Sequence, residues 1–135
     1  IMAPHDPFVF DAQGNYVELM DPLEGYANEV QYINGRLLEI VRVILAQSDT
    51  PPVIVIQGDH GWSTRNRNKN LNAYHLPGAG ADKIYPTITP VNTFRVILDT
   101  YFGGRYGLIE DKQLASGPGP IYQFELVQPS CVSTP

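Results

Sequence analysis

Four residues near the middle of the chain, Gly58-Asp59-His60-Gly61, place a carboxylate beside an imidazole. This combination suits a divalent ion such as Mn²⁺ or Zn²⁺, with Mg²⁺ as a further candidate. In a regular strand Asp59 and His60 would point to opposite faces and could not share one ion. The flanking glycines let the backbone turn, so both side chains can converge. The alternative is a turn capped by Asp59 and followed by an ordinary loop histidine.

A run of four β-branched apolar residues, Val53 to Ile56, leads directly into this motif. Continuous apolar character is typical of a central strand that is buried on both faces of a parallel sheet. Ligands of open α/β sheets bind at the carboxyl ends of the strands. We therefore expect Asp59 and His60 at the ligand-binding edge of a parallel sheet.

One helix is expected before this strand in the sequence and another after it. Apolar residues recur at three- and four-residue spacing between Val30 and Ile44, which predicts an amphipathic helix over residues 27–47. Thr89 as the N-cap and Pro90 at the first helical position predict a second helix. The glycine pair Gly103-Gly104 should end it.

The rest of the chain is expected to hold short strands and turns. Residues 1–25 are rich in Pro, Asp and Gly and should be largely irregular. Residues 71–76 and 121–127 are predicted as short strands, residues 116–120 as a turn, and residues 128–135 as a frayed tail. Helix, buried strand, loop and helix in this order indicate the α/β class.

The length and composition of the chain limit the number of domains and the kinds of molecule it could bind. A length of 135 residues, with 43% hydrophobic and 17% charged residues, predicts one globular domain. The net charge of -5 argues against a nucleic-acid partner. No stretch is apolar enough to span a bilayer, so we expect this chain to be soluble. Cys131 is the only cysteine, which leaves no internal disulfide and no Cys/His zinc spacing.

Several segments, in order, resemble the sulfatase-like family of the alkaline phosphatase superfamily, which includes phosphoglycerol transferases and lipoteichoic acid synthases. PVIVIQGDHG resembles the metal-binding strand of that family, and YINGRLLEIVRVIL resembles the helix that leads into it. IMAPHDPF resembles a strand that ends in a histidine before a proline. NAYHLPG and TITPVNTFRVILDTYF resemble the segments after the metal site. The resemblance covers most of residues 1–104.

This resemblance implies a fold and roles for single residues. The chain would be one partial domain, the C-terminal part of an alkaline phosphatase-like sandwich with a mainly parallel central sheet. Asp59 and His60 would be metal ligands. His5 would face the substrate or a metal near the reacting ester; its alternative is a surface histidine before a proline-rich turn. The expected cofactor is a divalent ion, Mn, Zn or Mg.

The residue pair also bears on the substrate. Calcium-dependent sulfatases of the family usually have Asp-Asn at this position, whereas the phosphotransferases and phosphoesterases have Asp-His. Asp59-His60 therefore favours phosphate over sulfate esters and disfavours calcium. The nucleophile and the first acidic metal ligand of the family lie upstream of these residues, and Cys131 is in the wrong place to be that nucleophile. We expect the chain to be the C-terminal piece of a longer enzyme.

A basic cluster follows the motif. Arg65, Arg67 and Lys69 could contact the phosphate of a small-molecule or lipid-headgroup ester. The alternative is a solvated loop face. By resemblance, the longer protein would be membrane-anchored with its catalytic domain outside the cytoplasm.

Two other functional classes stay open. In one, the chain is a non-catalytic α/β interaction domain and the Asp-His pair is only structural. In the other, the longer protein hydrolyses sulfate esters and carries a formylglycine-type cysteine upstream. Without the remainder of its parent, the chain should be inactive and bind metal weakly at most. Its unpaired strand edges should favour self-association.

Overall fold

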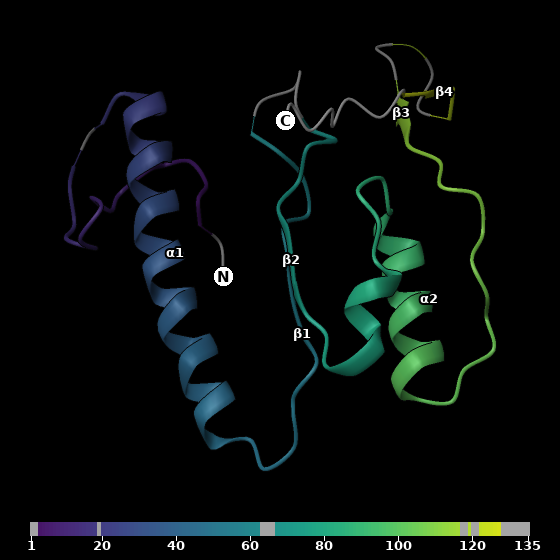
Figure 1. Ribbon diagram of the computed structural model, residues 1–135. Coiled ribbons are helices and arrows are strands. Elements are labelled where there is room, and N and C mark those ends of the chain that lie inside the picture. Colours follow the sequence, from purple (N-terminus) through teal and green to yellow (C-terminus); the bar gives the residue numbers. More distant parts are fainter. Residues whose placement is uncertain (1–2, 19, 63–66, 117–118, 120–121, 128–135) are drawn as a thin grey trace. The chain divides into compact units, whose positions relative to one another are not determined.

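The computed structural model describes residues 3–18, 20–62, 67–116, 119 and 122–127. The elements in chain order are α1 (Pro22–Gln47), β1 (Ile54–Gln57), β2 (Asn72–His75), the 3-10 helix η2 (Gly78–Lys83), α2 (Pro90–Tyr101), β3 (Leu114–Ser116) and β4 (Phe124–Leu126) (Figure 1). The chain divides into two compact units, residues 1–51 and 52–135, and each is described by itself.

Helix α1 begins five residues before the predicted start. The Asp21 carboxylate accepts hydrogen bonds from the backbone N–H groups of Leu23 (3.0 Å) and Glu24 (3.4 Å). Pro22 occupies the first helical turn, where its missing N–H costs no helical hydrogen bond. The expectation of an irregular segment up to residue 25 was therefore wrong at its end, because Asp21-Pro22 is itself a helix start signal.

The first turns of α1 carry the packing of the N-terminal unit. Gly25 is buried, and a Cβ at this position would lie 2.5 Å from the Cβ of Phe8. Phe8 also packs edge-on against Tyr26, with ring centroids 6.2 Å apart. Glu29 is only 2% exposed, and its carboxylate accepts the backbone N–H of Val9 at 2.9 Å. These contacts hold the N-terminal segment against the helix.

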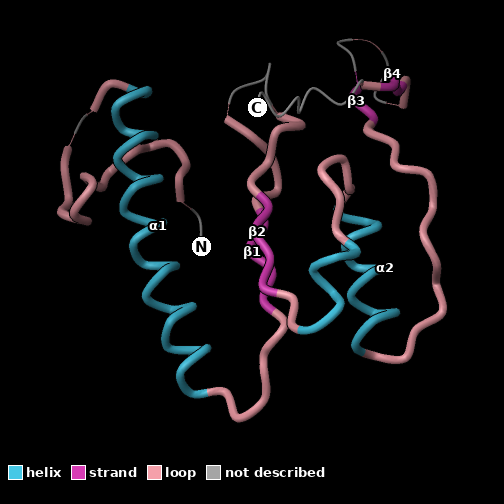
Figure 2. The backbone as a smooth tube through the Cα atoms, viewed as in Figure 1, coloured by secondary structure: helices cyan, strands magenta, loops and turns pink. Residues whose placement is uncertain are grey.

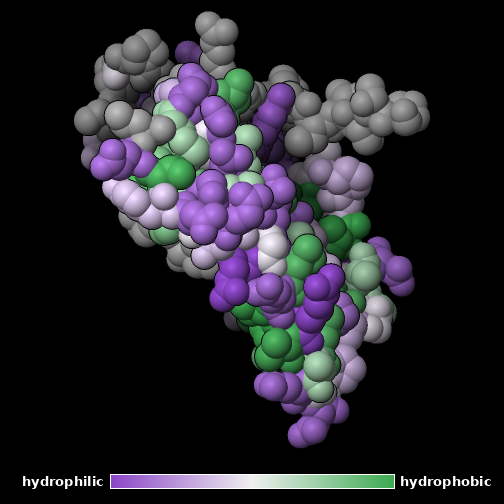
Figure 3. Space-filling model, turned by 90° about the vertical axis from the view of Figure 1, so that its left-hand side faces the viewer, coloured by the Kyte–Doolittle hydropathy of each residue, from purple (hydrophilic) through white to green (hydrophobic). Residues whose placement is uncertain are grey.

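The second half of α1 is exposed along much of its apolar surface. Leu38, Ile40, Val43, Ile44 and Leu45 are between 37% and 55% exposed. Figure 3, which looks onto the side on which α1 lies in Figure 1, shows hydrophobic residues at the surface beside hydrophilic ones. The predicted amphipathic helix is present, but its apolar stripe is covered mainly in the first turns.

Strands β1 and β2 form an antiparallel hairpin, not part of a parallel sheet (Figure 2). Ile54 pairs with His75 and Gln57 with Asn72. The predicted buried parallel strand is corrected here: every residue of β1 is only partly buried, and both sheets in the described residues have two antiparallel strands. A continuous run of β-branched apolar residues indicates strand preference, but it identifies neither the partner strand nor the degree of burial. The broader prediction of a mixed helix and strand protein holds.

Helix α2 begins and ends where the sequence indicates. Thr89 is the N-cap, Pro90 is in the first turn, and Gly103, with a φ of +69°, follows the C-cap residue Phe102. The helix packs against η2, and its Tyr101 hydroxyl donates to the Pro77 carbonyl oxygen at 2.6 Å.

An extended segment, residues 104–111, is bound by side chains on one face of α2 instead of by a strand. Asn92 accepts the N–H of Ile109 (3.1 Å) and donates to its carbonyl oxygen (2.8 Å). Asp99 accepts the N–H groups of Tyr106 and Gly107, while Arg95 donates to their carbonyl oxygens. These contacts satisfy backbone groups that a sheet would otherwise pair.

Asp111 closes this arrangement at the start of α2. Its carboxylate accepts hydrogen bonds from the Thr89 N–H (2.8 Å), the Thr89 hydroxyl (2.5 Å) and the Tyr85 hydroxyl. Burial alone would raise the pKa of Asp111, but the hydrogen bonds from Thr89 and Tyr85 outweigh it and lower the pKa. The hydrogen bond to Asp111, reinforced by burial, raises the pKa of Tyr85. Thr89 thus uses its hydroxyl on Asp111 and not on the helix backbone.

The chain continues into a second hairpin, formed by β3 and β4. Leu114 pairs with Leu126 and Ser116 with Phe124. The predicted last strand over residues 121–127 is present as β4, whereas β3 was not predicted. Residues 128–135, expected to be frayed, lie outside the described residues. None of the helices in the described part of the chain combines the length and apolar character that a membrane span requires.

Candidate functional site

The predicted motif lies in the turn that follows β1. Gly58 N–H still donates to the Leu71 carbonyl oxygen at 2.9 Å, as a continuation of the hairpin ladder. The chain then turns, and Gly61 N–H donates to the Arg67 carbonyl oxygen at 2.8 Å. Asp59 and His60 therefore lie outside the regular strand, between two glycines whose backbone N–H groups are hydrogen-bonded.

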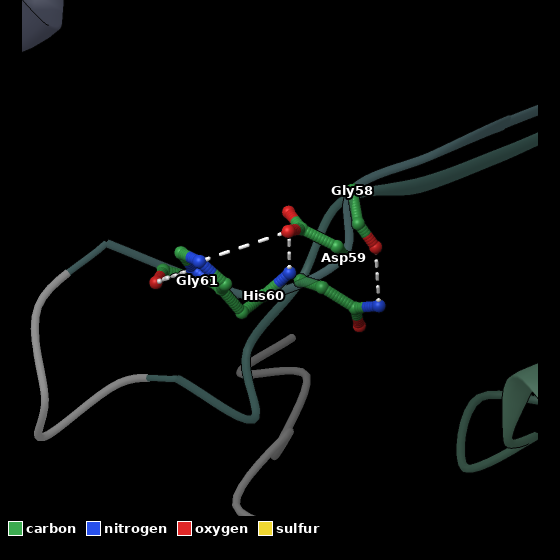
Figure 4. A network of polar contacts seen from close by, with 5 residues as sticks. Gly58, Asp59, His60 and Gly61 are labelled. Atoms are coloured by element: carbon green, nitrogen blue, oxygen red, sulfur yellow. Dashed lines mark hydrogen bonds and ion pairs between the residues drawn. The ribbon is translucent and has the colours of Figure 1, made fainter. Parts of the chain in front are cut away.

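The Asp59 and His60 side chains lie beside one another in this turn (Figure 4). Asp59 Oδ2 lies 3.7 Å from His60 Nε2, and the other oxygen, Oδ1, accepts the His60 backbone N–H at 3.0 Å. A separation of 3.7 Å is longer than a hydrogen bond. The Asp59 side chain is 90% exposed and that of His60 is 40% exposed. Both groups are thus open to solvent and adjacent without a direct hydrogen bond.

The histidine ring has a defined orientation. His60 Nδ1 lies 3.0 Å from the Gly61 carbonyl oxygen. A carbonyl oxygen only accepts hydrogen bonds, so this contact requires the proton of the neutral ring on Nδ1. The lone pair is then on Nε2, the nitrogen that faces Asp59. Histidines that bind metals commonly donate their other N–H to a carbonyl or carboxylate in this way.

The geometry of the pair fits a divalent ion in part. Two ligand atoms that each bond one ion at about 2.1 Å can lie up to about 4.2 Å apart, so 3.7 Å is compatible with a shared ion. A carboxylate oxygen and an imidazole nitrogen are suitable donors for Mn²⁺ or Zn²⁺. Among the residues that the structure describes, no group of three or more His, Cys, Asp or Glu side chains could hold a metal. In the part of the chain that the structure describes, the pair therefore offers two possible donor atoms, fewer than a protein metal site normally has.

The segment that returns from the loop into β2 contributes two residues that were not predicted from the sequence, Asn70 and Asn72. Asn70 Nδ2 donates to the Gly58 carbonyl oxygen at 2.8 Å, and Asn72 Nδ2 donates to Asn70 Oδ1 at 3.1 Å. The first of these bonds appears as the dashed line at Gly58 in Figure 4. A signal was present in the sequence, because residues two apart in an extended chain lie on one face. Without the antiparallel pairing, that face could not be assigned to the motif.

The structure describes three of the other residues singled out from the sequence, His5, Arg67 and Lys69. His5 belongs to the other unit, where it is exposed, its Nδ1 lying 2.6 Å from the Asp6 carbonyl oxygen. Arg67 and Lys69 are exposed on the return arm of the loop. Arg65 and Cys131 lie outside the described residues.

Comparisons with known proteins do not assign the chain to a family. No protein-family model, no curated protein and no solved structure matches this sequence.

Proposed function

We propose that this chain is part of a metal-dependent hydrolase or transferase that acts on phosphate esters. In this proposal Asp59 and His60 are two of the metal ligands. The observation that supports it best is the orientation of His60: its Nδ1 faces a backbone carbonyl oxygen at 3.0 Å and its Nε2 lies 3.7 Å from Asp59 Oδ2. This arrangement presents a carboxylate oxygen and, in the neutral ring, the lone pair of Nε2 to solvent at the end of a strand.

When bound, a divalent ion at such a site would polarise the phosphoryl oxygens and lower the pKa of a coordinated hydroxyl. Asp59 would supply one anionic oxygen, and its other oxygen stays engaged by the His60 N–H, which fixes the carboxylate orientation. His60 would supply Nε2, with the ring held through Nδ1. The nucleophile and the further ligands would come from the remainder of a longer protein.

The other predicted residues have secondary roles in this proposal. Arg65, Arg67 and Lys69 would contact the anionic substrate, a small-molecule or lipid-headgroup phosphate ester. His5 would bind the ester or assist the leaving group.

A second candidate function is a non-catalytic interaction domain. It is favoured by the exposed apolar side chains of α1, such as Leu38 and Val43, at 55% and 52% exposed. Surface of this kind marks protein contacts when it is contiguous. Under this alternative the Asp59–His60 pair would only stabilise the turn.

A Mn²⁺ titration followed by NMR separates the two candidates. Mn²⁺ broadens the signals of nuclei close to it, so weak binding by two ligands remains detectable. In the 135-residue chain we expect the His60 ring signals to broaden before those of His75. His75 is a matched control because it is exposed and pairs with Ile54, at the other end of the same hairpin.

The His60→Ala and His75→Ala variants complete this test. Loss of the broadening at the Asp59 amide in His60→Ala, and its persistence in His75→Ala, is the expected result. Equal broadening of all histidines in the wild-type chain, or unchanged broadening at Asp59 without His60, would reject the metal site and leave the interaction domain as the better account.

A further inference from the structure

The turn that carries Asp59 and His60 is held by a relay of two asparagine side chains. Asn72 Nδ2 donates to Asn70 Oδ1 at 3.1 Å, and Asn70 Nδ2 donates to the Gly58 carbonyl oxygen at 2.8 Å. The Gly58 carbonyl belongs to the peptide group that joins Gly58 to Asp59. The relay therefore ends on the peptide plane from which the Asp59 side chain departs.

The direction of this relay is fixed by chemistry. The Gly58 carbonyl oxygen can only accept, so Asn70 must turn its NH₂ group toward it. The Asn70 amide oxygen then faces Asn72, which must in turn present its own NH₂ group. Reversing either amide would place two acceptors against each other.

This direction leaves one group without a partner. Within the described residues, Asn72 Oδ1 is buried and makes no hydrogen bond. A buried acceptor without a partner destabilises a fold, and such groups are rare outside sites where another requirement outweighs stability. An apolar side chain at this strand position, opposite Gln57, would avoid the unpaired oxygen. The relay thus fixes the Gly58 carbonyl group but leaves a buried acceptor unpaired, which lowers local stability.

We infer that Asn70 is a positioning residue for the Asp59–His60 metal pair and that Asn72 orients Asn70. The inference rests on the proposed function and names two residues that serve it without touching the ion. With the Gly58–Asp59 peptide fixed, Asp59 Oδ1 can accept the His60 N–H at 3.0 Å while Oδ2 faces His60 Nε2. If the peptide plane were free to rotate, the two donor atoms would no longer be held 3.7 Å apart.

Three variants of the 135-residue chain test this inference. Asn70→Ala removes the donor to Gly58, and Asn72→Val removes the group that orients Asn70 while also removing the unpaired oxygen. Asn68→Ala is the matched control, because Asn68 is an exposed asparagine in the same loop. The measurements are the Mn²⁺ concentration that half-broadens the His60 ring signals, the thermal midpoint, and the temperature coefficient of the His60 amide proton without metal.

The expected pattern separates positioning from simple stabilisation. Loss of a group that orients a metal ligand typically lowers metal affinity 10- to 100-fold. We expect a weakening of about tenfold or more in Asn70→Ala and a smaller one in Asn72→Val, whose thermal midpoint should stay unchanged or rise. The His60 amide should lose its hydrogen-bonded temperature coefficient in Asn70→Ala. Asn68→Ala should change none of these values.

Contrary outcomes overturn either the positioning role or the proposed function. If the wild-type chain binds Mn²⁺ at His60 and both asparagine variants bind it equally well, the positioning role is overturned and the proposed function stands. A lower thermal midpoint in Asn72→Val with unchanged affinity would likewise show a purely structural relay. If the wild-type chain does not bind Mn²⁺ at His60, the proposed function is overturned, and the metal role of Asn70 falls with it.

Discussion

Asp59 and Asp111 are two carboxylates of the same unit with opposite surroundings. Asp111 accepts three hydrogen bonds, from the Thr89 N–H, the Thr89 hydroxyl and the Tyr85 hydroxyl, and holds residues 104–111 at the start of α2. Asp59 accepts only the adjacent His60 N–H among the described contacts, and its side chain is 90% exposed. Both oxygens of Asp111 accept hydrogen bonds, whereas one oxygen of Asp59 is left open beside an imidazole nitrogen.

This difference shows how to tell a structural carboxylate from a candidate ligand. Protein donors around Asp111 stabilise its charge, which is why its pKa is lowered despite burial. A carboxylate whose two oxygens both accept hydrogen bonds from the protein has less capacity left for an ion. The open oxygen of Asp59, fixed in direction by the His60 N–H, retains that capacity. Substitutions at the two residues should therefore affect different properties.

The largest effect is expected for Asp59→Ala. It should weaken Mn²⁺ binding by at least about 100-fold, beyond the range seen when only a supporting residue is lost. Its thermal midpoint should be unchanged, because substitutions of exposed side chains usually alter stability by less than about 0.5 kcal/mol. The measurement is Mn²⁺ broadening of the His60 ring signals together with a thermal melt. Asp82→Ala, at an exposed aspartate of η2, is the control; a loss of binding in both variants would contradict a specific site.

Asp111→Ala should show the reverse pattern. Loss of hydrogen bonds to a charged group typically costs about 1.5–3 kcal/mol, so we expect the free energy of unfolding to fall by about 3 kcal/mol. Mn²⁺ broadening at His60 should not change. Urea unfolding measures the first quantity. Glu110→Ala is the matched control, since Glu110 is exposed and pairs only with Lys112 among the described contacts, which predicts a change below about 1 kcal/mol. Similar losses in both variants would show that Asp111 contributes no more than a surface ion pair.

A smaller effect is expected from pH. The pKa of Asp111 is lowered below its usual 3.8, so its contribution to stability is present above pH 3.8 and is lost as the pH falls further. The pKa of Tyr85 is raised above 10.0, so its contribution is present below pH 10 and is lost as the pH rises beyond it. The urea midpoint should be constant at intermediate pH and should fall at both the acidic and the alkaline end of this range. In Asp111→Ala both decreases should be smaller. Decreases of unchanged size in that variant would show that other groups cause them.

The two helices could be predicted because their signals are local. The apolar spacing of α1 and the Thr89-Pro90 start of α2 each depend on residues a few positions apart. The start of α1 was missed because Pro22 and Gly25 suggested irregular structure. Gly25 is in fact required inside the helix, where Phe8 approaches too closely for a side chain.

The pairing of β1 could not be predicted, because no local pattern specifies a partner strand. The sequence analysis expected a buried parallel strand from four β-branched residues, whereas β1 pairs antiparallel with β2. Asp59 and His60 lie side by side, with Oδ2 and Nε2 3.7 Å apart, and their role as metal ligands stays a prediction. The supporting asparagines and the Asp111 network depend on contacts between residues 12 to 26 positions apart, such as Gly58–Asn70 and Tyr85–Asp111, and required the structure.

The most direct test of the central claim uses the protein expressed from its complete gene. Bound metal and turnover of a generic phosphodiester would be measured for the wild type, His60→Ala and His75→Ala. We predict that His60→Ala loses both metal and turnover, because Nε2 of His60 is one of the two metal-ligand atoms proposed among the described residues, while His75→Ala retains both. Metal content and turnover that are unchanged without His60 would contradict the account.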